Sequence, residues 1–180
     1  CAHFHPGATP PAPATDLVFV GHFEHPPNRD AARFLVDDVL PRLGRPVHIR
    51  LVGQGMTPAV AALARPGVVE IAGAVPDVRP HLAAARVVVA PVRFGTGMRG
   101  KVLEALAMGR PLVTTTLGAE GLDATAGHHL LVANGADAFA VAIRQVLDDH
   151  DLAARLGAAG RALAEARFDW DAIATAHDEI

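Results

Sequence analysis

The sequence predicts a doubly wound α/β domain, in which helices cover both faces of a parallel sheet. Short strands that are apolar throughout alternate along the chain with helical stretches, and strands without polar alternation are typical of such buried sheets. The 180 residues, of which 51% are hydrophobic, suffice for one domain with a substantial core. These observations favour a Rossmann-like architecture followed by C-terminal helices.

Six strands and the helices between them can be placed from the apolar pattern and the turn residues. The predicted strands cover 17–20, 47–52, 68–71, 86–90, 112–115 and 129–132. The predicted helices cover a stretch capped by Asn28, then 57–64, 77–85, 98–108, 136–149, 151–166 and 170–180. Residues 1–15, with four prolines and no periodic pattern, are expected to form a linker or tail.

Composition excludes several classes of protein. A net charge of -3 argues against a nucleic-acid partner, and no apolar run is long enough to cross a bilayer. Cys1 is the only cysteine, so the chain has no disulfide framework, and the 10 histidines form no convincing ligand set, so no metal site is predicted. Because the chain starts at Cys1 rather than methionine and shows no signal peptide, we expect a cytoplasmic fragment of a longer protein.

The loops that follow the predicted strands favour a ligand crevice. They read GHFEHPPN, GQG, GAVPD, PVRFGTGMRG and TLGAEGL, and each contains glycine. Glycine at a single loop is ordinary turn chemistry, but parallel sheets bind ligands beyond the carboxyl ends of their strands, where these loops meet.

The densest signal is the glycine loop and helix at 93–110. This segment contains four basic residues and one acidic residue, Glu104, although the chain as a whole is acidic. The basic residues are Arg93, Arg99, Lys101 and Arg110, and Lys101 is the only lysine among the 16 basic residues of the chain. A helix start and local positive charge favour phosphate binding. Gly97, Lys101, Glu104 and Met108 fall along one helical stripe, so the ammonium can meet phosphate and the carboxylate can accept ribose hydroxyls. The alternative is a solvated Lys101–Glu104 pair.

The same loop also matches the dinucleotide fingerprint G-x-G-x-x-G literally. Gly95, Gly97 and Gly100 supply the glycines, and Glu120 lies about twenty residues on, as that fingerprint asks. However, 92–94 separates the strand from the first glycine, and Glu120 follows a further loop. A dinucleotide-dependent oxidoreductase domain therefore remains an alternative only.

The block GTGMRGKVLEALAMGRPLV, together with Val75-Pro76-Asp77, Gly118-Ala119-Glu120-Gly121-Leu122 and Phe168-Asp169-Trp170, resembles the retaining glycosyltransferases of the GT-B fold in the bacterial glycosyltransferase group 1. The resemblance covers 16–170 and implies the second, nucleotide-sugar-binding domain of a two-domain enzyme. It implies hexosyl transfer with retention, in carbohydrate or polysaccharide biosynthesis, with no metal or cofactor. The N-terminal acceptor domain would be the partner, 171–180 could cross to it, and the fragment would be inactive alone.

The resemblance also assigns roles to individual residues. Glu104 matches the second glutamate of the family's E-x7-E motif, which holds the donor ribose, whereas Thr96 stands where the first glutamate would contact the sugar. Lys101 and Arg99 would stabilise the leaving diphosphate as catalytic groups, and Val75 would meet the base. The implied donor-binding residues are Gly21, Asn28, Val75, Gly95, Thr96, Gly97, Met98, Lys101 and Glu104.

Two further functions stay open from the sequence. A sugar-nucleotide epimerase-like protein on the same fold would share the donor site and differ in the missing half. A non-catalytic binding or receiver-type domain is disfavoured because no strand ends in the aspartate that a phosphoacceptor needs. In the full-length enzyme, a place at the inner face of the membrane is compatible with the cytoplasmic assignment.

Overall fold

The computed structural model describes residues 4, 15–95 and 100–168. These residues form a six-stranded parallel sheet with the order β3-β2-β1-β4-β5-β6, which confirms the predicted fold class. The strands are β1 (Thr15–Val20), β2 (Ile49–Val52), β3 (Val69–Gly73), β4 (Ala85–Ala90), β5 (Leu112–Thr114) and β6 (Leu131–Val132). Each lies within about two residues of its predicted position.

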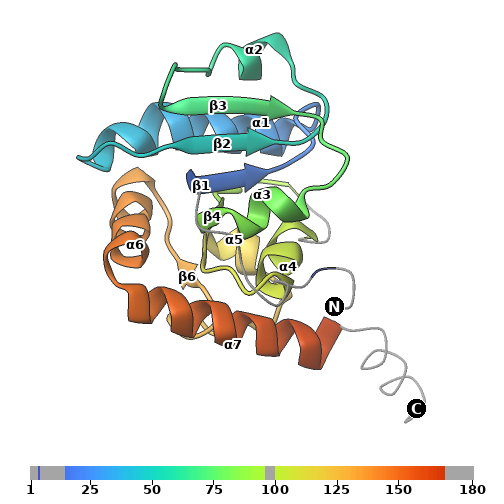
Figure 1. Ribbon diagram of the computed structural model, residues 1–180, viewed down its shortest axis with the longest axis vertical. Helices are drawn as coiled ribbons and strands as arrows, with labels where there is room; N and C mark the ends of the chain where they lie inside the picture. Colours follow the sequence, from blue (N-terminus) through green and yellow to red (C-terminus); the bar gives the residue numbers. More distant parts are fainter. Residues whose placement is uncertain (1–3, 5–14, 96–99, 169–180) are drawn as a thin grey trace.

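Helices cover both faces of the sheet (Figure 1). On one face lie α1 (Pro26–Arg33), which continues through a π-helical stretch η1 (Phe34–Val39) and a 3-10 turn η2 (Leu40–Arg42), and α6 (Ala136–Asp148). On the other face lie α3 (Arg79–Ala83) and α4 (Gly100–Ala107). The remaining helices are α2 (Pro58–Ala61), α5 (Thr116–Ala119) and α7 (His150–Phe168).

The core is divided by the sheet because successive side chains of a strand point to opposite faces. In β1, Leu17 and Phe19 pack with α1 and α6, whereas Val18 packs with α4. The long helix α7 contacts both layers, since Leu156 belongs to the first cluster and Ala164 to the second. The apolar strands are therefore buried on both faces, as their composition predicts.

The first helix differs from its prediction in a way that affects the site. It begins at Pro26, so Asn28 is not its cap but lies inside the first turn. Proline is favoured at the first helical positions, where its missing N–H needs no partner and its fixed φ suits the helix. The side chain of Asn28 is thereby freed from capping, and it is buried instead of facing the backbone of its own helix.

Other differences concern the ends of elements. The helix predicted over 77–85 is shorter and runs from Arg79 to Ala83, and just before it the carboxylate of Asp77 accepts the backbone N–H of Arg79 at 2.9 Å. The one-turn helix α5 was not predicted. The predicted helix over 170–180, the start of the one over 98–108 and most of the predicted tail lie outside the described residues. No helix in the described part of the chain is long and apolar enough to cross a membrane.

Candidate functional site

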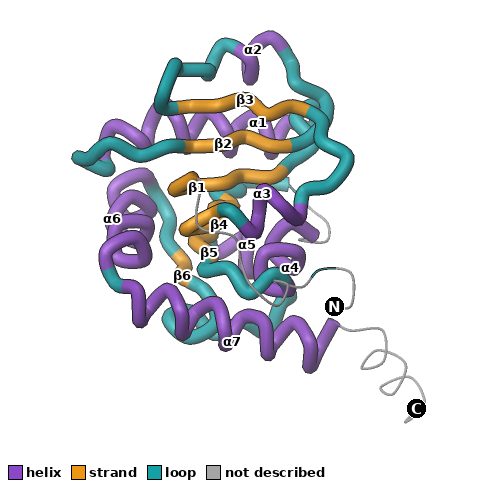
Figure 2. The backbone as a smooth tube through the Cα atoms, in the orientation of Figure 1, coloured by secondary structure: helices purple, strands orange, loops and turns teal. Residues whose placement is uncertain are grey.

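The order of the sheet makes β1 and β4 neighbours, and the crevice is here the region beyond their carboxyl ends. From the carboxyl ends of these neighbouring strands, the chain leaves to opposite faces, into α1 after β1 and into α4 after β4. Figure 2 shows the loops after β1, β2 and β3 leaving the sheet on the same side. Such a switch point is where doubly wound sheets bind ligands. Among the described residues, Asn28 after β1 and Lys101 after β4 meet there.

Lys101 and Asn28 join the two sides of this crevice. The Lys101 ammonium donates to Asn28 Oδ1 at 2.7 Å, although the two residues lie 73 positions apart in the sequence. Asn28 Nδ2 in turn donates to the backbone oxygen of His22 at 2.8 Å. Lys101 Nζ also lies 5.9 Å from the centre of the buried Phe19 ring, within cation–π range. A half-buried positive charge is thus held at the carboxyl end of β1.

Glu104 lies one helical turn beyond Lys101 and is also half-buried. Burial raises the pKa of its carboxyl group above the ordinary 4.5, and the nearby Lys101 ammonium offsets this rise in part. Val102 and Leu106, on another side of the same helix, are buried in the core on this face of the sheet. Met108, however, is fully buried in the core beyond the end of α4, so the predicted crevice-facing stripe ends at Glu104.

The glycine loop after β4 is pressed against the start of α1. Gly95 has a backbone φ of +109°, which residues with a side chain rarely adopt. A Cβ at this position would lie only 2.9 Å from Pro27 Cγ. Glycine at this position therefore lets the loop pass beside the helix start. Thr96, Gly97, Met98 and Arg99 lie outside the described residues, so their predicted roles stay predictions.

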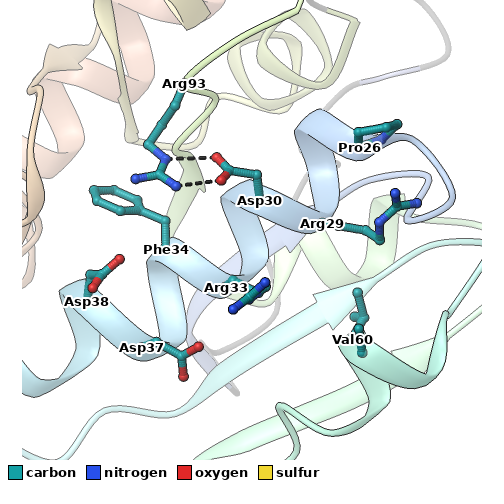
Figure 3. A pocket seen from close by; sticks show the side chains of 10 residues that line it. Pro26, Arg29, Asp30, Arg33, Phe34, Asp37, Asp38, Val60 and Arg93 are labelled. Atoms are coloured by element: carbon teal, nitrogen blue, oxygen red, sulfur yellow. Dashed lines mark hydrogen bonds and ion pairs between the residues drawn. The ribbon is translucent and has the colours of Figure 1, made fainter.

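A second connection between loop and helix joins Arg93 to Asp30. Arg93 donates from Nε to Asp30 Oδ2 at 2.8 Å and from Nη2 to Oδ1, and its guanidinium lies 4.6 Å from the centre of the Phe34 ring (Figure 3). These hydrogen bonds raise the pKa of Arg93 above its ordinary value. From the sequence, Arg93 was predicted only to contribute positive charge. Its partner on α1 was missed because nothing in the local pattern shows which strands are neighbours.

Arg93 also lines a pocket of about 510 Å³ over the outer side of α1 (Figure 3). Its charged lining residues are three arginines and three aspartates, so the lining has no net formal charge. Arg29, which follows Asn28 in α1, lines this pocket, and its Nη1 donates to the backbone oxygen of Glu24. The lining residues are Pro26, Arg29, Asp30, Arg33, Phe34, Asp37, Asp38, Ala59, Val60 and Arg93.

The predicted positive cluster is smaller than the sequence suggests. Arg110 lies past the far end of α4, where its Nη1 donates to the backbone oxygen of Ala85 at the start of β4. Burial lowers the pKa of this guanidinium. Helix α4 runs from the crevice toward the amino end of β4, so Arg110 lies away from the crevice. Of this cluster, Lys101 is the described residue that faces the crevice.

The other predicted residues lie at the same edge of the sheet. Gly21 follows β1 directly, and Val75 follows β3, which is separated from β1 by β2. Val75 is half-buried against the α4 layer. The rings of His22 and His25 pack edge to face beside the crevice, with their centroids 4.8 Å apart. The described residues contain no group of three potential metal ligands. The glycine fingerprint follows β4, whereas the dinucleotide motif follows the first strand, which disfavours the oxidoreductase alternative.

Comparisons with known proteins agree with this architecture. Residues 14–149 match the family model described as glycosyl transferases group 1. No curated protein matches the chain. Anabaena HepE, solved with UDP and glucose, is 20% identical with a TM-score of 0.76, over 92% of this chain and 47% of that one. Sucrose-phosphate synthase from Thermosynechococcus elongatus is 25% identical with a TM-score of 0.73, over 92% and 44%.

A third neighbour has almost the same extent as this chain. The C-terminal domain of a glycosyl transferase group 1 family protein from Francisella tularensis is 14% identical with a TM-score of 0.70, over 93% of this chain and 96% of that one. The chain spans about half the length of HepE and of sucrose-phosphate synthase. All of them share its fold.

Proposed function

Because the chain belongs to the glycosyl transferases group 1 family, we propose that it is the donor-binding, C-terminal half of a retaining glycosyltransferase. It would hold a nucleoside-diphosphate sugar while a hexosyl group passes to an acceptor bound by an N-terminal domain. The observation that carries the proposal is the placement of Lys101 and Glu104, one turn apart, at the switch point between β1 and β4.

The extent of the chain supports the assignment to one half of such an enzyme. It spans about half of HepE and sucrose-phosphate synthase, yet nearly all of the Francisella tularensis C-terminal domain. HepE was solved with UDP, which makes a nucleoside diphosphate a suitable probe.

The chemistry follows from the charges at the crevice. Transfer requires that the nucleoside diphosphate leave with its negative charge stabilised, and fixed positive groups in a partly dry site do this effectively. Lys101 would contact the diphosphate, with Arg99 as a second cation, while Gly95 and Gly97 would bring backbone N–H groups close. Glu104 would accept hydrogen bonds from the ribose hydroxyls. The proposal includes no metal or cofactor.

The remaining predicted residues complete the donor site in this proposal. Gly21 allows close approach beside the diphosphate, and Val75 contacts the base. Thr96 and Met98, from the same loop as Gly97, would lie against the sugar. Asn28 belongs to the diphosphate end, next to Lys101.

Replacement of Lys101 tests the placement of the diphosphate. Lys101→Met should weaken UDP binding by roughly 1.5–3 kcal/mol, the usual cost of a lost charge-assisted hydrogen bond, and leave uridine binding nearly unchanged. Calorimetric titration of the 180-residue chain with both ligands measures this. Arg155→Met, which removes a charge from the exposed surface of α7, is the matched control and should change neither affinity. Equal losses for UDP and uridine would contradict the proposal.

A further inference from the structure

We infer that Asn28 is a positioning residue, whose side-chain amide holds the Lys101 ammonium in place at the crevice. The inference rests on the proposed function, in which Lys101 contacts the diphosphate. It differs from a direct contact between Asn28 and the donor, because both ends of the amide already have partners. Asn28 accepts from Lys101 Nζ at 2.7 Å and donates to His22 O at 2.8 Å.

The chemistry of the partners fixes the orientation of this amide. An ammonium can only donate and a backbone carbonyl can only accept, so the amide oxygen must face Lys101 and its nitrogen must face His22. An aspartate would present an oxygen to the His22 carbonyl, and an alanine would reach neither partner. Asparagine therefore satisfies both contacts at this position without adding charge.

Packing keeps the amide in this orientation. Asn28 is 8% exposed and sits in the first turn of α1, which begins at Pro26. On one side of the side chain lies Gly21, where an added Cβ would come within 3.2 Å of Asn28 Cγ. A close-packed amide with two hydrogen bonds is a rigid anchor for a lysine, whose four-carbon stem is otherwise flexible.

Neutrality and rigidity together explain the benefit for diphosphate binding. Because the amide is uncharged, it orders the ammonium and leaves its positive charge available. A carboxylate partner would neutralise that charge. An ammonium that is ordered before the ligand arrives loses less side-chain freedom on binding. Asn28 should thus increase diphosphate affinity through Lys101, with no effect on a ligand that lacks phosphates.

The first test observes Lys101 without any ligand. Since Lys101 is the only lysine, a chain labelled with 13C and 15N lysine gives a single side-chain ε-CH2 resonance. In Asn28→Ala this resonance should shift and narrow, because the stem becomes mobile. The matched control is Asn134→Ala. This substitution removes the side chain of the other asparagine in the chain, together with its two hydrogen bonds to Thr116. An ε-CH2 resonance that is unchanged in Asn28→Ala would overturn the inference.

The second test is a double-mutant cycle on UDP and uridine affinity. Asn28→Ala should weaken UDP binding several-fold and leave uridine binding unchanged, and it should have no further effect in a Lys101→Met background. Equal losses in both backgrounds would show that Asn28 acts on the donor or the fold directly, and would overturn the inference. If Lys101→Met alone leaves UDP affinity unchanged, the proposed function fails. The ligand-free spectrum then still shows whether Asn28 orders the Lys101 side chain, so the two failures can be told apart.

A third variant keeps the test decisive if Asn28→Ala unfolds. Asn28→Asp has the same shape but places a negative charge beside the ammonium. It should weaken UDP binding more strongly than Asn28→Ala, because the carboxylate neutralises Lys101 in addition to losing the contact with His22. Wild-type UDP affinity in Asn28→Asp would overturn the inference.

Discussion

Two neighbouring charges of α4 are half-buried but differ in the partners that compensate their burial. The Lys101 ammonium is half-buried but has a fixed acceptor in Asn28 and an aromatic ring nearby. Glu104 is also half-buried, and burial raises the pKa of its carboxyl group above the ordinary value despite Lys101. An ionised carboxylate that is partly removed from water costs stability unless a partner compensates it. Glu104 is therefore better suited to a ligand than to the stability of the free domain.

The pH dependence of stability follows from this pKa. Because the folded-state pKa of Glu104 is raised, the group's contribution to stability is fully present below the unfolded value of about 4.5 and is lost as the pH rises through the folded value. Glutamine does not ionise, so Glu104→Gln avoids the stability that wild type loses when the Glu104 carboxyl group ionises. Thermal melts should show the variant more stable than wild type at neutral pH, with a difference that shrinks toward pH 4.5. Lower stability of the variant at neutral pH would reveal a stabilising partner of the carboxylate.

The same substitution separates ribose binding from a surface role. If Glu104 accepts both ribose hydroxyls, wild type should bind UDP more tightly than its 2′,3′-dideoxy analogue, and Glu104→Gln should lose most of that preference. Hydrogen bonds to a charged group contribute about 1.5–3 kcal/mol. Titration of both ligands measures the preference, and Glu165→Gln on the exposed surface of α7 is the control. A full preference in Glu104→Gln would show that the ribose binds elsewhere.

At the level of elements, the strands could be predicted and their partners could not. The apolar run before Gly21 predicts a buried strand because a parallel sheet has no polar face. The order that makes β1 and β4 neighbours depends on tertiary packing, which local periodicity does not contain. For the same reason the sequence predicted Asn28 as a helix cap, and the Pro26 start of α1 with the Asn28–Lys101 contact emerged only from the structure.

The glycine loop and α1 should be coupled through Arg93. Arg93 and Arg65 have equal side-chain exposure, 44%, and each pairs with an aspartate, but only Arg93 adds a second hydrogen bond and the Phe34 ring. Single exposed ion pairs contribute about 0–1 kcal/mol, and a cation–π contact at an exposed site adds about 0.5–1 kcal/mol. In urea unfolding, Arg93→Ala should therefore lose about 1 kcal/mol more than Arg65→Ala. Equal losses would show that the bidentate contact does not stabilise the loop.

At the level of the whole molecule, the proposed donor contacts lie at one edge of the sheet. The loops after β1, β2 and β3 leave the sheet at one edge, where we propose that a nucleotide binds. In our proposal, the acceptor contacts belong to residues outside this chain, and its coverage of about half of HepE supports that division. Binding and turnover should therefore be separable.

The isolated chain should bind nucleoside diphosphates and transfer no sugar. Binding needs only the crevice between β1 and β4, whereas transfer also needs an acceptor held against the donor sugar and water excluded between them. A thermal-shift panel of nucleoside diphosphates and their sugars should show stabilisation that grows with ligand concentration. Incubation of the same chain with a stabilising donor and a range of acceptors should release no nucleoside diphosphate. Sustained release that Lys101→Met abolishes would mean that this chain contains a complete active site, and would contradict the proposed division between two halves.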